Sequence, residues 1–171
     1  SRGLGDVYKR QGHWLYYWKH NSSTMNILIL QGPNLNLLGL QSSKVKDTLT
    51  LSKLNKSLKI YFKEKNITFK TYQTHKQFQA VNILQRNRNW ADGILFIPTS
   101  WARYEYTLFD TITLINIPTS IVFFDEPLSM GPGIKESIFI GENIRNYSGA
   151  PIDACVAGFE GLRFHELSRS S

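Results

Sequence analysis

One segment of this 171-residue chain groups residues that could bind a small polar molecule. It covers residues 31–39 (QGPNLNLLG) and follows directly after a short apolar run. Gly32 and Pro33 favour a tight turn, and the side-chain amides of Asn34 and Asn36 can hydrogen-bond to the loop backbone or to a ligand hydroxyl. The segment lacks the G-x-G-x-x-G and G-K-[ST] patterns of nucleotide-binding loops. The turn therefore indicates a small-molecule site that is not a nucleotide site.

The other reactive side chains form no recognisable pattern. His75 and His165 are too far apart in sequence to predict a metal site, and no cofactor or metal is expected. Asp125 and Glu126 form an acidic pair that could coordinate Mg²⁺, although acidic loop residues are common. Cys155, the single cysteine, lies in an apolar run and is interpreted as an inert core thiol. It excludes an internal disulfide, which fits a reducing compartment.

The apolar runs predict elements that would bring this turn to the edge of a parallel sheet. We predict strands at 26–30, 67–72, 93–97, 119–124 and 154–159. We predict helices at 48–65, capped by Thr48, at 78–90, at 104–115 and, in a short form, at 161–167. Strands that alternate with helices favour a doubly wound α/β fold, a five-stranded parallel sheet in three layers. Ligands of such folds bind beyond the carboxyl ends of the strands, here at 31–47, 98–103 and 125–147.

Composition favours one folded domain at residues 25–171. With 42% hydrophobic and 19% charged residues, the chain can bury a single core. Residues 1–24, which open with SRGLGDVYKRQ, are interpreted as a non-native or disordered extension, and the SRSS ending is interpreted as foreign too. The alternative for the extension is a basic aromatic arm that stacks on bases or lies on a membrane surface.

The global charge indicates no strong polyanionic partner. The net charge is +7, but four basic residues and one acidic residue precede Met25, which leaves +4 for the domain. This weak signal does not favour a nucleic-acid partner. The longest apolar run, near 117–124, contains Pro118, Thr119 and Ser120 and is too short to cross a bilayer, so no membrane partner is expected and the location is interpreted as cytoplasmic.

The sequence MNILILQGPNLNLLG resembles the N-terminus of the type II 3-dehydroquinate dehydratases, flavodoxin-like enzymes of the shikimate pathway. The motifs YQT, ADGILFIP, LFD, IP, YSGA and AGF follow in the same order, so the resemblance spans about residues 25–162. It implies a flavodoxin-like fold and a hydro-lyase that converts 3-dehydroquinate to 3-dehydroshikimate. It also implies a small polyhydroxy carboxylate ligand and a homo-oligomer of trimers packed into dodecamers.

Residue types differ at the positions where this resemblance implies catalysis. The implied tyrosine and its activating arginine correspond to Lys46 and Gln41, and the implied glutamate and acid histidine correspond to Ile121 and Phe123. A phenyl ring cannot donate a proton. Lys46 could act as a base only if its pKa fell from about 10.4 by roughly three units.

Four further positions indicate ligand or subunit contacts by resemblance. Asn34 matches the residue that helps organise the site, and Asp110 matches one that braces a neighbouring subunit. Arg103 stands at a histidine position and could clamp a carboxylate through two hydrogen bonds. Asp125 stands at a serine position. These four are the predicted substrate-binding residues, and Lys46 is the catalytic candidate.

Two hypotheses follow for the function. The first is a divergent dehydratase with weak or no ordinary activity. The second is a non-catalytic paralogue that keeps the fold and serves as a small-molecule-binding or assembly module. Losing a catalytic acid or base typically costs about 10² to 10⁴ in rate, so the substituted positions favour the second hypothesis. An extra loop is expected at 127–142, close to the site.

Overall fold

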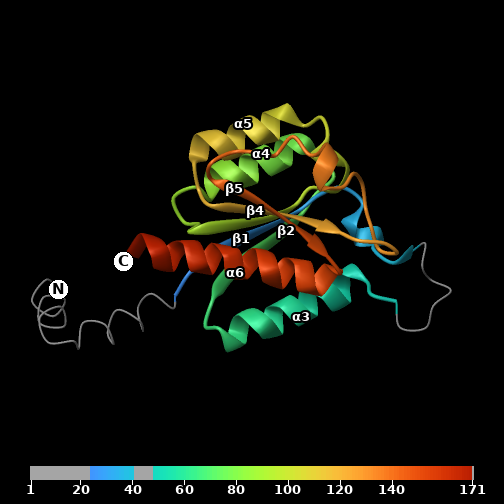
Figure 1. Ribbon diagram of the computed structural model, residues 1–171, viewed down its shortest axis with the longest axis horizontal. Coiled ribbons are helices and arrows are strands. Elements are labelled where there is room, and N and C mark those ends of the chain that lie inside the picture. The colour runs from blue at the N-terminus through green and yellow to red at the C-terminus, as the bar shows by residue number, and fades with distance from the viewer. Residues whose placement is uncertain (1–23, 41–47, 171) are drawn as a thin grey trace, which may run out of the picture.

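A five-stranded, wholly parallel sheet forms the centre of the molecule (Figure 1). The computed structural model describes residues 24–40 and 48–170. The strands are β1 (Asn26–Gln31), β2 (Thr68–Gln73), β3 (Gly93–Ile97), β4 (Thr119–Phe124) and β5 (Ile144–Gly149). Their spatial order is β2-β1-β3-β4-β5, and every neighbouring pair is parallel. This order confirms the predicted α/β class, a doubly wound sheet with its switch point between β1 and β3.

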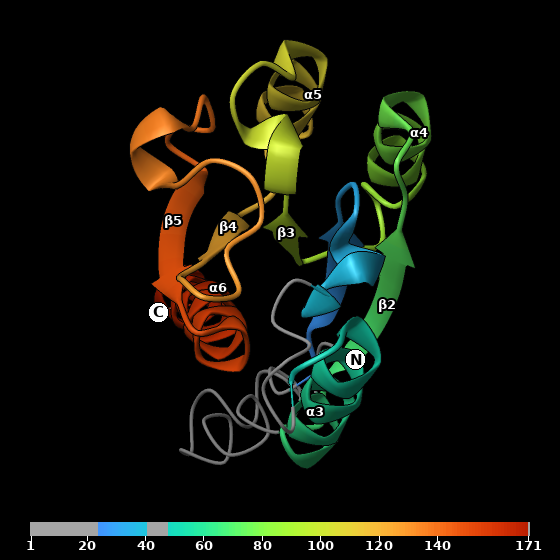
Figure 2. The ribbon, with the colours of Figure 1, turned by 90° about the vertical axis from the view of Figure 1, so that its right-hand side faces the viewer.

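Helices cover both faces of the sheet and complete three layers (Figures 1 and 2). The helices α3 (Leu51–Glu64) and α6 (Pro151–Ser170) lie on one face. The helices α4 (Gln77–Arg86) and α5 (Tyr106–Ile115) lie on the other. Three short 3₁₀ helices, η1 (Leu35–Leu37), η3 (Thr99–Ala102) and η4 (Ile134–Glu136), belong to the loops. None of the helices in the described part of the chain is long and apolar enough to span a bilayer.

The strands divide the core into two clusters because side chains alternate between the faces of a sheet. In β1, Ile27 and Ile29 pack toward α3 and α6, whereas Leu28 and Leu30 pack toward α4 and α5. All four side chains are almost fully buried. A strand buried on both faces explains the nearly continuous apolar run in its sequence.

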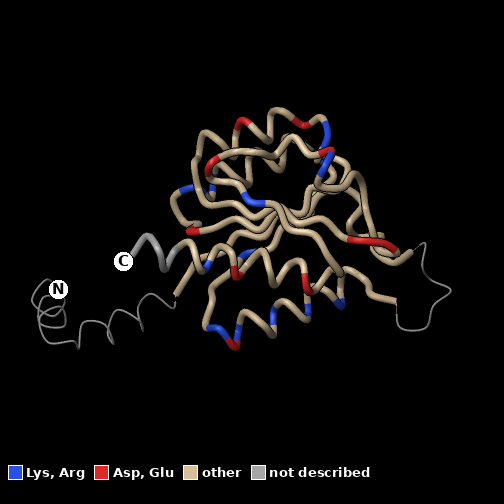
Figure 3. Tube along the Cα trace, in the orientation of Figure 1, with Lys and Arg blue, Asp and Glu red and all other residues tan. Residues whose placement is uncertain are grey.

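The helix α3 begins later than the sequence predicts. Thr50, not Thr48, is its N-cap, and the Thr50 hydroxyl accepts a hydrogen bond of 3.3 Å from the backbone N–H of Lys53. Both threonines are capping residues by type, so the sequence alone could not choose between them. Leu54, Leu58 and Phe62 face the core, and the lysines of α3 occupy the exposed side (Figure 3). The lysine row is therefore a solvated helix face.

The prediction for the fifth strand is wrong. Residues 154–159 lie in the 20-residue helix α6, and the strand is Ile144–Gly149. The short apolar run ACVAGF is compatible with a buried strand and with a buried helix, and periodicity cannot separate the two. The real β5 pairs only with β4 at an edge of the sheet, and its sequence IRNYSG has the polar character of such a position. The predicted short helix at 161–167 is the second half of α6.

Candidate functional site

A pocket of about 390 Å³ lies at the carboxyl ends of β1, β3 and β4. Three loops line it, and each belongs to a segment that the sequence analysis singled out. The lining residues are Pro33, Asn34, Leu37, Gly39 and Leu40 after β1, Thr99 and Ser100 after β3, and Pro127, Leu128, Ser129, Met130 and Gly131 after β4. This volume suits a small molecule, and the location is where doubly wound folds bind ligands.

Three side chains hold the backbone of the turn after β1. Gln73 Nε2 donates to the carbonyl of Gly32 at 3.0 Å, and Thr99 Oγ1 donates to the carbonyl of Pro33 at 2.7 Å. The backbone N–H of Asn34 donates to His75 Nδ1 at 3.0 Å. Because β2 and β3 flank β1, their ends supply these partners from both sides. Asn34 is thereby fixed in a left-handed conformation, with φ of 65°.

Close backbone contacts join the loops that form the pocket. A Cβ on Gly32 would lie 2.4 Å from the carbonyl oxygen of Pro98, and a Cβ on Gly131 would lie 2.4 Å from the carbonyl carbon of Thr99. Gly131 also has a φ of 81°, which favours glycine. Thr99 itself has a φ of 51°, a strained value for a β-branched residue. The three loops therefore pack tightly against one another at the pocket, and Thr99 in the loop after β3 has a strained backbone conformation.

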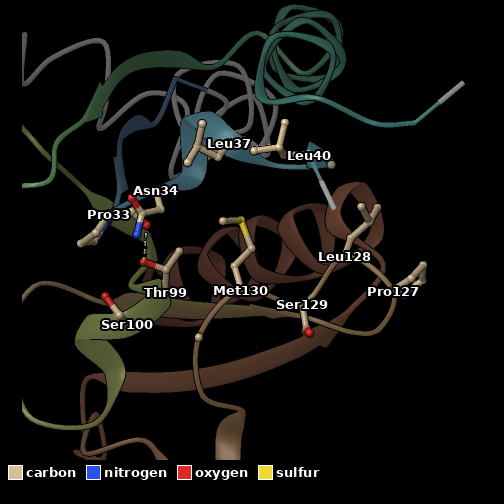
Figure 4. Close-up of a pocket in the computed structure, with 12 residues that line it drawn as sticks. Pro33, Asn34, Leu37, Leu40, Thr99, Ser100, Pro127, Leu128, Ser129 and Met130 are labelled. Atoms are coloured by element: carbon tan, nitrogen blue, oxygen red, sulfur yellow. Dashed lines mark hydrogen bonds between the residues drawn. The ribbon is translucent and has the colours of Figure 1, made fainter. Parts of the chain in front are cut away.

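The lining combines aliphatic side chains with uncharged polar groups (Figure 4). Leu37 and Leu40 stand on the wall formed after β1, and Met130 extends toward Leu37 from the loop after β4. Polar groups come from Asn34, Thr99, Ser100 and Ser129. No residue that lines the pocket in the described part of the chain carries an ionisable side chain. The described wall can form hydrogen bonds and apolar contacts but cannot transfer a proton through an acid or a base.

Of the predicted site residues, Asn34 lines the pocket and three described ones do not. Arg103 forms an ion pair with Glu136, and its guanidinium lies 5.8 Å from the centre of the Tyr104 ring. Asp110 is exposed on α5, and Asp125 is exposed directly after β4. Lys46 and Gln41 lie outside the described residues, as do residues 1–23 of the predicted N-terminal extension.

The β4 positions where the resemblance implies an acid histidine and a glutamate are part of the core. Phe123 and Ile121 are 5% and 0% exposed and belong to the cluster under α4 and α5. Neither residue is among those that line the pocket. Both side chains therefore contribute packing at this end of the sheet.

Sequence reasoning missed the residues that brace the turn. His75 was considered only as a metal ligand and was not expected to be one, and Gln73 and Thr99 were not singled out. The YQT motif at the end of the second strand contains Gln73. Its contact with the turn could not be predicted from the motif, because it depends on the pairing of β1 with β2, which puts Gln31 beside Gln73. The expectation that the extra loop lies near the site agrees with the position of residues 127–131 in the pocket wall.

Metal-binding clusters are not found among the described residues, where no three His, Cys, Asp or Glu side chains come together. Cys155 is buried in the core, as predicted from its apolar surroundings. Burial raises the pKa of its thiol to about 12, so the thiol stays protonated at neutral pH. These observations leave the pocket as the candidate site.

Comparisons with known proteins agree on one family. The sequence profile described as "Dehydroquinase class II" matches residues 25–130. A 3-dehydroquinate dehydratase of Pelotomaculum thermopropionicum is 35% identical over 114 residues, which are 67% of this chain and 79% of the relative. A 3-dehydroquinate dehydratase of Clostridium botulinum is 28% identical over 93 residues, which are 54% of this chain and 63% of the relative.

Solved structures show the same fold. A type II dehydroquinase from Butyrivibrio crossotus superposes with a TM-score of 0.71 at 23% identity and covers 82% of this chain and 98% of its own. A 3-dehydroquinate dehydratase-like protein from Bifidobacterium longum gives 0.58 at 16% identity and covers 84% of this chain and 98% of its own. At these identities the structural likeness concerns the fold alone.

Proposed function

This chain belongs to the class II dehydroquinase family, and from that premise we propose that it is a divergent member that binds a small polyhydroxy molecule with weak or no dehydratase activity. The pocket beside Asn34 is the binding site in this proposal. Within the family, dehydration of 3-dehydroquinate is the expected reaction by resemblance. A family fold does not by itself confer that reaction, because activity depends on the groups in the site.

The uncharged lining of the pocket is the observation that carries this proposal. Removing a proton next to a carbonyl and expelling water requires a positioned base and acid with pKa values near the working pH. The described wall offers an amide, hydroxyls and aliphatic side chains. Phe123 and Ile121, at the implied acid and glutamate positions, are packed in the core. A binding module is the function that such a wall supports best.

The remaining site residues enter the proposal with different roles. Arg103, Asp110 and Asp125 are outside the pocket lining. We assign Arg103 and Asp125 to the surroundings of the pocket and Asp110, by resemblance, to a subunit contact. Asp110 is exposed on α5 and is available to a second copy of the chain. A homo-oligomer is thus part of the proposal, and sedimentation velocity of the full chain at several concentrations measures it.

The alternative is a divergent enzyme that uses Lys46. Lys46 lies outside the described residues, in the sequence segment between Leu40, which lines the pocket, and Thr48. An unprotonated lysine could take over the role of the implied tyrosine. This version predicts a measurable turnover that is lost in the variant Lys46→Ala.

A turnover assay separates the two functions. Purified full chain is mixed with 3-dehydroquinate, and the absorbance of the conjugated enone product is followed beside the Pelotomaculum thermopropionicum relative as a positive control. Because acid and base groups each contribute about 10² to 10⁴ in rate, we expect turnover at least about 10⁴-fold below the control. A rate within about tenfold of the control would overturn the proposal.

A further inference from the structure

We infer that His75 is a positioning residue for the pocket, and that protonation of its imidazole releases the turn at Asn34 and weakens ligand binding. The inference rests on the proposed function, since it concerns the regulation of the same site. Three observations carry it: the direction of the hydrogen bond between these two residues, the anchored loop that holds His75, and the place of Asn34 in the pocket wall.

The hydrogen bond between Asn34 and His75 requires the neutral imidazole. The backbone N–H of Asn34 is the donor, and Nδ1 of His75 is the acceptor, at 3.0 Å. Nδ1 therefore carries no proton, and the neutral ring has its proton on Nε2. When the ring gains a second proton, both nitrogens become donors, and the new N–H group faces the N–H of Asn34. Two donors cannot share a hydrogen bond, so protonation breaks this contact.

The loop that carries His75 is anchored on both sides of the ring. The backbone N–H of Thr74 donates to the carbonyl of Gln31 at 3.0 Å, which continues the pairing of β2 with β1. The hydroxyl of Thr74 accepts from the backbone N–H of Lys76 at 3.0 Å and donates to the side chain of Gln79. Thr74 is buried, whereas His75 is exposed. The backbone at His75 is thus fixed, while solvent can deliver a proton to the ring.

Asn34 connects the state of this ring to the pocket. It has a φ of 65°, a left-handed conformation that is uncommon outside glycine. Asn34 lines the pocket together with Leu37, and its carbonyl accepts a hydrogen bond of 2.8 Å from the backbone N–H of Leu37 (Figure 4). The other two side chains that hold the turn are an amide and a hydroxyl, which do not titrate. We therefore expect protonation to loosen the wall at Asn34 without unfolding the turn.

Histidine is the side chain whose charge ordinarily changes between about pH 5 and 8. Lys76 follows His75 directly, and α4 has Arg86 in its last turn and no acidic residue in its first. The turn itself, residues 31–40, has no ionisable side chain. Other charged residues of the surrounding strand ends and loops are Lys70 on β2, Arg103 after β3, Asp125 and Glu126 after β4, and Lys44, Lys46 and Asp47, which lie outside the described residues. Lysine, arginine and carboxylate side chains ordinarily keep their charge in this range, so we expect the imidazole to respond.

Hydrogen exchange at the backbone amide of Asn34 tests the inference without a ligand. The full chain is compared at about pH 7.5 and about pH 5.5, and each rate is divided by the rate of an unstructured peptide at the same pH. Protection should fall at least about threefold at the acid pH, which is the loss of one ordinary hydrogen bond. His75→Asn offers an amide oxygen as acceptor and cannot be protonated, so its protection should stay high at both pH values. His75→Ala has no acceptor and should be poorly protected at both.

Binding of quinate measures the effect on the pocket. Quinate is a cyclic polyhydroxy acid whose carboxylate stays ionised in this range, and it lacks the carbonyl that the dehydration needs. Titration calorimetry of the full chain should give at least about threefold weaker binding at the acid pH. His75→Asn should bind as tightly as the parent does at neutral pH and show no pH dependence, and His75→Ala should bind weakly throughout. His165→Asn, on α6, is the matched control and should keep the pH dependence of the parent.

Each other outcome has a defined meaning. Protection or binding that does not fall at the acid pH in the parent overturns the inference, and so does an equal fall in His75→Asn. Equal damage by the asparagine and alanine variants at neutral pH also overturns it, because His75 would then act through packing alone. If quinate binds at neither pH up to about 10 mM, the proposed binding function fails, while exchange at Asn34 still decides the role of His75. The two failures are therefore distinguishable.

Discussion

Two side chains, Cys155 in the core and Tyr61 packed against the core, have pKa values that the fold raises. Burial raises the pKa of Cys155 from its usual 9.0 to about 12. Burial also raises the pKa of Tyr61 from 10.0 to about 12, with help from the hydrogen bond that its hydroxyl donates to Glu160 at 2.9 Å. In both residues the folded protein favours the neutral form. They therefore contribute stability that is complete below pH 9 and is lost as the pH rises toward 12.

We expect this loss to be visible in the pH dependence of unfolding. The free energy of unfolding in urea should fall between pH 9 and pH 11, because the unfolded chain releases protons that the folded chain retains. The variant Cys155→Ala should shift the whole curve downward through the lost packing but reduce its slope in this range. Val156→Ala, a half-buried neighbour on α6 without a titratable group, is the control and should leave the slope unchanged. An unaltered slope in Cys155→Ala would contradict the assignment.

Residue types predicted part of the site and no more. Asn34 could be identified because its side-chain amide follows a Gly-Pro turn directly after a strand and because it matches a site residue by resemblance. Gln73, His75 and Thr99 could not, since their partners are backbone groups of a different strand or loop. A hydrogen bond between segments 41 or more positions apart depends on strand pairing, and residue type does not reveal it.

At the scale of elements, the contact of α6 with the sheet depends on a small residue. Gly158 faces the sheet, and its carbonyl accepts a hydrogen bond of 2.7 Å from the hydroxyl of Ser120. A Cβ at Gly158 would lie 2.8 Å from Leu95 Cδ1 and 3.2 Å from Val122 Cγ2. The helix therefore approaches β3 and β4 more closely than a larger residue would permit.

We expect Gly158→Ala to destabilise the protein despite the higher helix propensity of alanine. Propensity favours alanine by about 1 kcal/mol, whereas crowding in a packed core typically costs about 1 to 3 kcal/mol. Gly158→Val should cost more, because its larger side chain also has a lower propensity than alanine. Urea denaturation measures both, with Ala157→Val on the exposed side of α6 as the control. Stabilisation by Gly158→Ala would show that the helix can shift away from the sheet without loss.

The side-chain composition of each element explains whether the sequence predicted it well. Gly93–Ile97 and Thr119–Phe124 were placed with their observed bounds, because both are buried strands rich in Ile, Val and Phe. Residues 154–159 were misplaced because Ala, Cys and Gly pack against the sheet as part of a helix, and an all-apolar run of this length has no decisive period. The edge strand β5 has few buried residues and so left only a weak signal.

At the scale of the whole molecule, the loop between β4 and β5 connects the two halves of the core. Its first part lines the pocket, and there Leu128 and Met130 pack against the cluster under α3 and α6. Its second part carries Phe139, which is fully buried in the cluster under α4 and α5. The backbone N–H of Ile138 also donates to the carbonyl of Ala102 at 2.8 Å. One loop thus links the pocket wall to packing on the opposite face of the sheet.

We expect Phe139→Ala to remove a large share of the total stability. The ring lies 5.4 Å from Phe96 and 6.3 Å from Phe109, measured between ring centres, and no part of it is exposed. Replacing a buried phenylalanine by alanine costs about 3 to 5 kcal/mol, against a total of about 5 to 15 kcal/mol for a domain. Urea denaturation of the variant measures this loss, and Ile140→Ala, whose side chain is 72% exposed, should stay within about 0.5 kcal/mol of the parent. A loss below about 1 kcal/mol in Phe139→Ala would mean that the loop is not anchored in the core and that the pocket wall has no support from the opposite face.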